Sequence, residues 1–309
     1  MQISIKERFK HIVESLTFIL SILLFLSFFG NYFHVFELLT HFTFQYVFLF
    51  LMSFVFFALC KDKKWISISC IGLFICLIDV IPWYLPSNNL VKTHKMDVFI
   101  ANVNTANYNY QKVIEQIKNK DAQIVGLVEV SIIWLDKIKE IESIYPYHYK
   151  YPRGDNFGLA LYSKHPILDP SIVFFGKSMA PSIVATIKHK KDLKFILTHT
   201  LPPISKNYAK RRNDHLKDMA KYSKDKLKLI IGGDFNLTMY SKDYKNFIST
   251  SGLKNSRKGF GILPSWGPFL LSIPIDHLLT SKDFNTNKIE ILEDNGSDHY
   301  PVYAKLSYN

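Results

Sequence analysis

Three long apolar runs occupy the first third of the chain. They extend over residues 15–33, 42–60 and 65–85; the first two contain no charged residue and the third contains one, Asp79. A helix of about 20 apolar residues is long enough to cross a hydrocarbon core of roughly 30 Å. The runs lack the polar face that helices of a soluble bundle show, and two more runs after the first argue against a cleaved signal peptide. The pattern therefore predicts three transmembrane helices.

The positions of the basic residues predict an orientation for these helices. Lys6, Arg8 and Lys10 precede the first run, and Lys61, Lys63 and Lys64 separate the second from the third. Residues 31–41, between the first two runs, contain no lysine or arginine. Because cytoplasmic loops are enriched in these residues, we expect the N-terminus inside. We therefore expect a multi-pass protein of the cytoplasmic membrane whose C-terminal part lies outside.

Beyond the apolar runs the pattern alternates between strands and helices. Short apolar segments predict strands, and apolar residues three or four apart predict helices. The expected strands cover residues 96–104, 122–130, 157–163, 183–189, 193–200, 226–236, 274–281 and 300–306, and the expected helices cover 110–120, 207–224 and 241–252. The excess of strands favours a four-layer α/β sandwich, in which helices flank two packed mixed sheets. We expect an anchor with its linker over 1–89 and a catalytic domain over 90–309.

Charge and cysteine content narrow the chemistry of the second domain. The 309 residues carry a formal net charge of +12, of which residues 1–96 account for +3 and the remainder for +9. A basic domain suits anionic partners such as phosphates, nucleic acid or lipid headgroups, although a lysine-rich surface without a specific partner has the same composition. All three cysteines lie before residue 90, which excludes a disulfide framework or a cysteine metal site in the second domain.

Polar side chains stand where the predicted strands end. They are Asn102, Glu129, His199, Asp234, Asn236, Asp276, Asp298 and His299. In the stretch Leu229–Leu237 three aliphatic residues lead into two glycines, and Asp234 and Asn236 follow two positions apart, on one side of the pleat. We expect Gly232 and Gly233 to let the backbone turn at this point.

Each of these residues has an ordinary structural explanation when taken alone, as a turn former, a solvated strand end or a satisfied histidine. Together they form a set of carboxylates, amides and imidazoles along one rim of two packed sheets. Oxygen-rich sets of this kind suit Mg²⁺ or Mn²⁺. The set therefore predicts metal-dependent hydrolysis of phosphate esters.

The order of these residues resembles that of the endonuclease/exonuclease/phosphatase superfamily, which shares the deoxyribonuclease-I-like fold. The matching segments are ANVNT (101–105), VGLVEV (125–130), THT (198–200), GGDFN (232–236), IPIDHLL (273–279) and GSDHYPV (296–302). The resemblance covers about residue 97 to the C-terminus. Ala101, Asn104 and Val128 stand where the family often has an aromatic residue, an aspartate and a glutamine. These departures count against a nuclease more than against hydrolase chemistry.

The resemblance and the donor chemistry together imply a ligand set for the metal. Glu129 is the best ligand candidate, with Asn102 beside it and Asp298 as a further ligand. Mg²⁺ takes one or two protein carboxylates and keeps several waters, so this short set is sufficient.

The same reasoning assigns the catalytic roles. Asp234 would orient or deprotonate the attacking water, and Asn236 would hold the phosphate. His299 would donate to a phosphoryl oxygen while Asp276 keeps it cationic, and His199 would be a second donor near the leaving group.

Two other histidines have structural explanations. His277 follows Asp276 in a strand and is expected to point to the opposite face. His215 lies in a helix rich in lysine and arginine and is expected at the surface.

The substrate remains open between a lipid headgroup phosphate, a nucleic acid and a small phosphate ester. The lipid bilayer is an expected partner, and no obligate protein partner is evident. The alternative function is a non-catalytic, membrane-tethered binding module that kept the fold, but a chain of that kind is expected to have lost at least one residue of the set.

Overall fold

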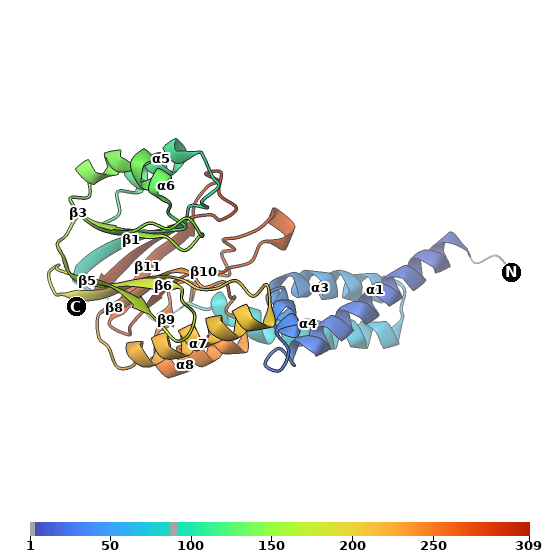
Figure 1. The fold of residues 1–309 in the computed structure, drawn as a ribbon. Helices are drawn as coiled ribbons and strands as arrows, with labels where there is room; N and C mark the ends of the chain where they lie inside the picture. The colour runs from blue at the N-terminus through green and yellow to red at the C-terminus, as the bar shows by residue number, and fades with distance from the viewer. Residues whose placement is uncertain (1–3, 87–91) are drawn as a thin grey trace.

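An elongated helical segment extends from one side of a layered α/β domain in the computed structural model, which describes residues 4–86 and 92–309 (Figure 1). The helical segment contains α1 (Ile5–Ser27), α2 (His34–Thr40), α3 (Thr43–Leu59), α4 (Lys63–Val80) and the 3₁₀ helix η1 (Ile81–Trp83). Ser4 caps α1 in a capping box with Glu7, and Asp62 caps α4. The linker expected at 85–89 and the domain boundary at residue 89 fall largely within residues 87–91, outside the described part.

The three expected spans are only partly confirmed. α1 and α4 are long and apolar enough to cross a membrane. α3 has 17 residues, about 26 Å of helix, and reaches the length of a span only together with α2, from which it is bent by 62°. The described residues therefore hold two candidate spans, or three if the bent pair is one span. The first turn of α3 lies against the α/β domain, where Gln45 Nε2 donates to the carbonyl of Ser272 at 2.8 Å.

The α/β domain consists of two six-stranded mixed sheets flanked by helices. One sheet has the order β11-β12-β1-β2-β4-β3 and the other β5-β6-β7-β8-β10-β9. The strands are β1 (His94–Asn102), β2 (Ile124–Val128), β3 (Tyr147–Tyr151), β4 (Leu159–Ser163), β5 (Ile167–Phe174), β6 (Pro181–Ile187), β7 (Leu193–His199), β8 (Leu229–Asp234), β9 (Lys254–Asn255), β10 (Asp276–Thr280), β11 (Phe284–Ile291) and β12 (Val302–Tyr308). The helices are α5 (Tyr110–Lys120), α6 (Ile132–Lys137), α7 (Lys206–Ser223) and α8 (Lys242–Ser251), with 3₁₀ helices η2 (Lys139–Ser143) and η3 (Phe269–Leu271).

The predicted α/β sandwich is confirmed, and the errors in the strand prediction have one pattern. All eight predicted strands are present, and they are the eight interior strands of the two sheets. The four strands without a prediction, β3, β5, β9 and β11, are the four sheet edges. An edge strand buries less of its surface, so it lacks the continuous apolar run that marks a central strand. The side chains of β3, for example, are all exposed or half-buried.

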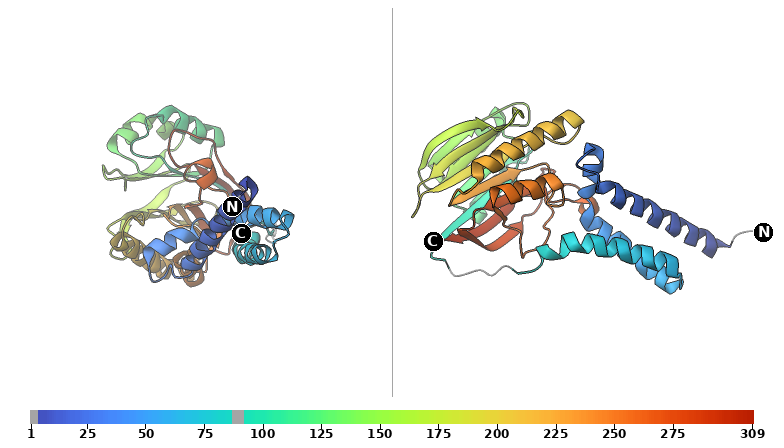
Figure 2. Two further views of the ribbon diagram at one scale, coloured as in Figure 1. Left: turned by 90° about the vertical axis from the view of Figure 1, so that its right-hand side faces the viewer. Right: turned by 90° about the horizontal axis from the view of Figure 1, so that it is seen from below.

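Three apolar layers hold the domain together. One lies between the sheets and includes Ile100, Leu197 and Leu278. A second packs α7 and α8 on the β7–β8 side, and a third packs α5 and α6 on the β1–β2 side. The site lies between the two sheets at one end, because β12 begins just after His299 and runs away from it to the C-terminus. That end faces the side from which the apolar helices extend (Figure 1; Figure 2).

A buried ion pair joins the helical segment to the α/β domain. Glu37 of α2 accepts from Arg212 Nη2 of α7 at 2.7 and 2.6 Å and from Ser241 Oγ at 2.8 Å. Both charged side chains are buried. Nearby, Lys245 pairs with Asp79 at the end of α4. The helices thus form a packed interface with the domain.

Candidate active site

The site is assembled from the ends of strands that neighbour one another in the two sheets. Asn102 ends β1 and Glu129 follows β2, its parallel partner. His199 ends β7 opposite Asp234, which ends β8. Asp234 also lies directly opposite Asp276, the first residue of β10. Facing sheets bring these ends together, as the sequence predicted.

The carboxylate of Asp234 lies at the centre of the site. Its Oδ2 is 3.2 Å from Asn102 Nδ2, 3.4 Å from His199 Nε2 and 3.7 Å from His299 Nε2. Its Oδ1 accepts from the backbone N–H of Asn236 at 2.7 Å. Burial raises the pKa of Asp234, but His299 and His199 outweigh this and lower it below the usual value. Asp234 is therefore an ionised acceptor at neutral pH, suited to orient or deprotonate a water.

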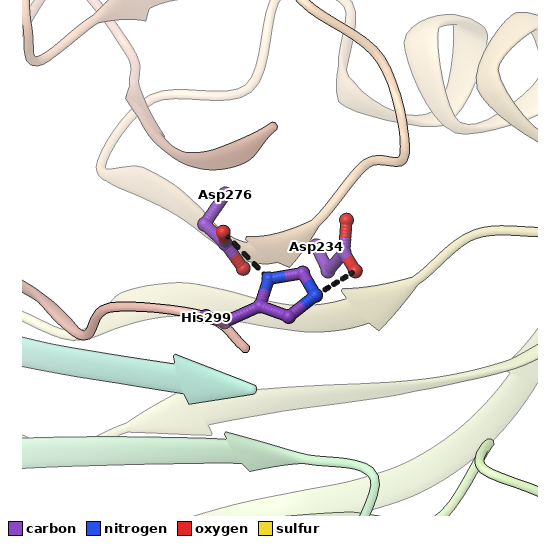
Figure 3. Close-up of side chains that lie close together, drawn as sticks. All are labelled: Asp234, Asp276 and His299. Carbon is purple, nitrogen blue, oxygen red and sulfur yellow. Dashed lines mark hydrogen bonds and ion pairs between the residues drawn. The ribbon is translucent and has the colours of Figure 1, made fainter. Parts of the chain in front are cut away.

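His299 is held between two carboxylates (Figure 3). Its Nδ1 lies 2.9 Å from Asp276 Oδ2, and its Nε2 faces Asp234. Burial lowers the pKa of His299, but Asp276 and Asp234 outweigh it and raise the pKa to about 10. The imidazole therefore carries a proton on both nitrogens at neutral pH and can donate from Nε2 to a negatively charged oxygen. Asp276 is buried, and its Oδ1 has no hydrogen-bond partner among the described residues.

His199 is the second imidazole beside Asp234. Its Nδ1 lies 3.0 Å from the carbonyl of Asn156 and donates to it, which directs Nε2 into the site. Nε2 is 3.2 Å from Asn236 Nδ2, the amide predicted to hold the phosphate. Burial lowers the pKa of His199, but Asp234 and Glu129 outweigh it and raise the pKa.

The predicted metal ligands are only partly brought together. Asn102 Nδ2 donates to Glu129 Oε1 at 2.8 Å, while Asn102 Oδ1 accepts from the backbone of Asn104. Asp298 instead accepts from Asn104 Nδ2 at 2.7 Å and from Trp266 Nε1 at 2.9 Å. Glu129 is half-buried and offers the hard oxygen that Mg²⁺ prefers; Asn102 could offer one only after its amide turned over.

A second possible cluster is formed by Asp234, Asp276 and His299, whose ligand atoms lie within 4.8 Å of one another. A cationic His299 cannot ligate a metal, because both ring nitrogens carry protons. The ion pairs of His299 therefore favour Glu129 as the principal ligand.

Three residues of the site have left-handed backbone. Asn104, Glu129 and Asn236 have φ of 56°, 63° and 49°. Asparagine tolerates this region, whereas glutamate there is strained, as residues at functional sites often are. The bend after β2 aims the Glu129 carboxylate at Asn102.

The expectation that Gly232 and Gly233 form a turn is wrong, because both lie within β8. A Cβ on Gly233, at φ 142°, would lie 1.8 Å from the carbonyl oxygen of Thr198 on β7. A Cβ on Gly232 would lie 2.6 Å from Ile100 in the opposite sheet. The two glycines therefore allow β8 to approach its neighbours closely, which brings Asp234 next to β7 and β1.

Several contacts around the site were not predicted. Asn104 and Trp266 bond Asp298, and Arg212 donates from Nη1 to the carbonyl of Asn236 at 3.2 Å. His215 is buried, not at the surface as predicted, and contacts Ser178 and Thr198. His277 is buried on the opposite face from Asp276, as predicted, and lies 2.8 Å from the carbonyl of Leu237.

The sequence profile described as the Endonuclease/Exonuclease/phosphatase family matches residues 100–299. The chain belongs to this family. The match begins just before Asn102 and ends at His299, so it contains every residue of the site. No match was found among curated proteins.

Solved structures of the endonuclease/exonuclease/phosphatase family share the fold. TDP2 of D. rerio complexed with single-strand DNA product is 14% identical with a TM-score of 0.60, covering 70% of this chain and 100% of its own. The human Nocturnin catalytic domain with bound sulfate is 17% identical with a TM-score of 0.57, covering 71% and 97%. A mannosyl-6-phosphatase of Bacteroides thetaiotaomicron is 20% identical with a TM-score of 0.55, covering 69% and 100%. At these identities the likeness establishes the fold.

Proposed function

We propose that this chain is a membrane-anchored phosphoesterase that uses a divalent metal, Mg²⁺ or Mn²⁺, and acts outside the cytoplasmic membrane. The observation that carries the proposal is the convergence of carboxylates, amides and histidines from distant segments around Asp234. Membership of the endonuclease/exonuclease/phosphatase family supports hydrolysis of a phosphate ester. In this proposal residues 1–89 form the anchor and residues 90–309 the catalytic domain.

The charges around Asp234 support a division of roles. Glu129 would hold the metal, which would supply positive charge for the phosphoryl oxygens. Asn102 would be a further ligand once its amide turned over, and Asp298 once it released Asn104 or Trp266. Asp234, ionised at neutral pH, would orient the attacking water. His299 would donate from Nε2 to a phosphoryl oxygen, where negative charge increases in the transition state.

Asn236 and His199 complete the proposed roles. Asn236 Nδ2 donates to the carbonyl of Thr200 at 2.9 Å and lies 3.2 Å from His199 Nε2, and its second N–H would donate to the phosphate. His199 shares that side of the site and would protonate or bond the leaving oxygen, because its raised pKa keeps a proton available near neutral pH. One donor, Asn236, would thus serve the bound phosphate, and the other, His199, the leaving group.

The apolar helices support anchoring at a membrane. α1 and α4 are long and apolar enough to span a membrane. Basic residues cluster at the end of the helical segment that lies far from the domain. If α2 and α3 together form the third span, the positive-inside rule favours a domain outside the cytoplasm.

The second candidate is a non-catalytic binding module on the same anchor. The residues around Asp234 are complete, so the distinction has to come from measurements of turnover and of metal binding. Calorimetry with Mn²⁺ separates the two: a module without chemistry has no need to bind the metal at Glu129.

The test is a substrate panel on the full-length protein in detergent, with Mg²⁺ or Mn²⁺ and after chelation. The panel contains bis-p-nitrophenyl phosphate, p-nitrophenyl phosphate, single-stranded DNA, RNA and phospholipid. We expect metal-dependent release of product from at least one of them. No turnover of any substrate, together with no metal binding, would favour the module.

A further inference from the structure

A short apolar loop projects from the wall of the site. Trp266 and Ile273 pair through both backbone hydrogen bonds and close a hairpin whose tip is Gly267–Ser272. The tip contains η3, in which Phe269, Leu270 and Leu271 are 91%, 78% and 56% exposed. Three consecutive large apolar side chains in water are unfavourable, so such a tip marks a surface that another apolar phase covers.

The loop begins at the catalytic residues themselves. Trp266 donates to Asp298 at 2.9 Å and forms a β-bridge with His299, and the N–H of Gly267 donates to the carbonyl of Asp298. The apolar tip is therefore only a few residues from the proposed phosphoryl donor. Whatever covers the tip lies directly beside the site.

The base of the loop is fixed to the apolar helices. Gln45, in the first turn of α3, donates to the carbonyl of Ser272, the last residue of the tip. The first exposed apolar residue beyond Gln45 is Phe48, and Leu49, Leu51 and Met52 follow it. Three residues of helix correspond to about 4.5 Å along its axis. The base of the loop thus lies about one helical turn before the exposed apolar residues of α3.

The two ends of the α/β domain differ in the polarity of their exposed side chains. At the site end, Ile132 and Ile133 after Glu129, and Ile204 after His199, are also exposed. At the opposite end, the turn between β6 and β7 exposes Lys188, Lys190, Lys191 and Asp192. Exposed apolar side chains therefore gather at the site end of the domain, together with the tip of the loop.

We propose that the Phe269–Leu271 loop inserts into the outer surface of the bilayer that α1 and α4 cross, and that the site acts on the phosphate ester of a lipid in that bilayer. The inference rests on the proposed function. A residue such as Phe269 is favoured at the interface of a membrane, where its ring leaves water while the neighbouring backbone stays hydrated. The loop would hold the site at the depth of the lipid phosphates.

Unpaired bases could also stack on an exposed aromatic ring, but the tip offers one ring and two leucines, and no basic side chain lies within Gly267–Ser272. Nucleic-acid sites combine aromatic side chains with a basic groove. The contact of the loop with α3 favours the bilayer over a nucleic acid.

Insertion is tested directly by fluorescence. Leu270→Trp is reconstituted as the full-length protein in phosphatidylglycerol and phosphatidylcholine vesicles with brominated acyl chains. Leu227→Trp, at an exposed leucine beside the far end of β8, is the matched control. We expect the fluorescence that the Leu270→Trp substitution adds to be quenched at least threefold more than the fluorescence that Leu227→Trp adds. Equal quenching of the two added signals would overturn the insertion.

The substrate class is tested by a split in activity. Phe269→Ser/Leu270→Ser/Leu271→Ser is compared with wild type and Leu227→Ser, on fluorescent phosphatidylglycerol in vesicles and on soluble bis-p-nitrophenyl phosphate. We expect the triple variant to lose about tenfold or more on the lipid and less than twofold on the soluble diester. An equal loss on both substrates, or none, would overturn the proposal.

The failure of this inference is distinguishable from failure of the proposed function. If wild type cleaves the soluble diester or single-stranded DNA but no lipid, the lipid inference is wrong and the phosphoesterase stands. If wild type cleaves nothing on the panel, both are wrong.

Discussion

Two buried clusters of charge in the described part of the chain, around Glu37 and around Asp234, are built differently. Glu37 and Arg212 form a closed pair: both carboxylate oxygens and all three guanidinium nitrogens have partners. The cluster around Asp234 is open, because two histidines compete for one carboxylate oxygen and Asp276 Oδ1 has no partner within the described part of the chain. A closed cluster joins two parts of a structure, whereas an open one has bonding capacity left for a substrate.

The two clusters touch at Asn236. Arg212 donates to the carbonyl of Asn236, whose side chain faces His199. The pair that joins α2 to the domain therefore also holds the loop after β8. For this reason the full chain, not residues 90–309 alone, is the appropriate protein for activity measurements.

The largest effect is expected in the open cluster. Asp234→Asn and His299→Asn remove the water-orienting carboxylate and the phosphoryl donor, and each should lower turnover about 10³-fold. Each substitution also leaves a buried charged group with one partner fewer, so a loss of stability is expected as well. Initial rates measured at equal concentrations of folded protein test the predicted loss of turnover. Asp192→Asn and His148→Asn, both at exposed positions, should keep wild-type rates.

The next largest effect is expected in the closed cluster. Glu37→Gln leaves the buried Arg212 cation without its counter-ion, which should cost about 3 kcal/mol of stability. Thermal unfolding of the full chain in detergent measures this loss. An unchanged midpoint would mean that the pair does not join the two parts of the structure.

Asp276→Asn tests whether the open cluster acts through a cationic His299. Without this carboxylate the pKa of His299 falls from about 10, so the cation is lost at a lower pH. Activity that needs the cation disappears as pH rises through that pKa, and the alkaline limb of the pH–rate profile should therefore move to lower pH. We expect a loss of about 100-fold at pH ~8. A limb that stays in place would contradict the assignment of His299 as donor.

The smallest effect is expected for an exposed ion pair. Glu140→Gln breaks the pair of Glu140 with Lys118, both of which are exposed, and should cost less than about 1 kcal/mol. It is the matched control for Glu37→Gln in the same unfolding experiment. If Glu140→Gln lost as much stability as Glu37→Gln, the effect of breaking an ion pair would not depend on its burial.

The sequence could predict the interior of the sheets because burial on both faces leaves continuous apolar runs. It could not predict the edge strands, where β3 and β11 alternate polar residues with apolar ones and β5 contains Pro170. The site residues could be predicted because each lies at, or within a few residues of, one end of an interior strand. The left-handed backbone of Glu129 has no signal in the sequence, since glutamate does not favour that conformation.

Long-range pairs were beyond prediction for a different reason. Glu37 and Arg212 are 175 residues apart, and nothing local indicates that either is buried. Segment 31–41 was expected to be the loop between the first two spans. The structure has α2 there, and its Glu37 pairs with Arg212 of α7.

The central claim is that this chain hydrolyses phosphate esters with a divalent metal. The most direct test strips the full-length protein with a chelator and follows turnover of bis-p-nitrophenyl phosphate as Mn²⁺ is added back. We predict no turnover without metal and a saturating rise with it. Turnover that does not depend on metal, or no turnover at any metal concentration, would contradict the claim.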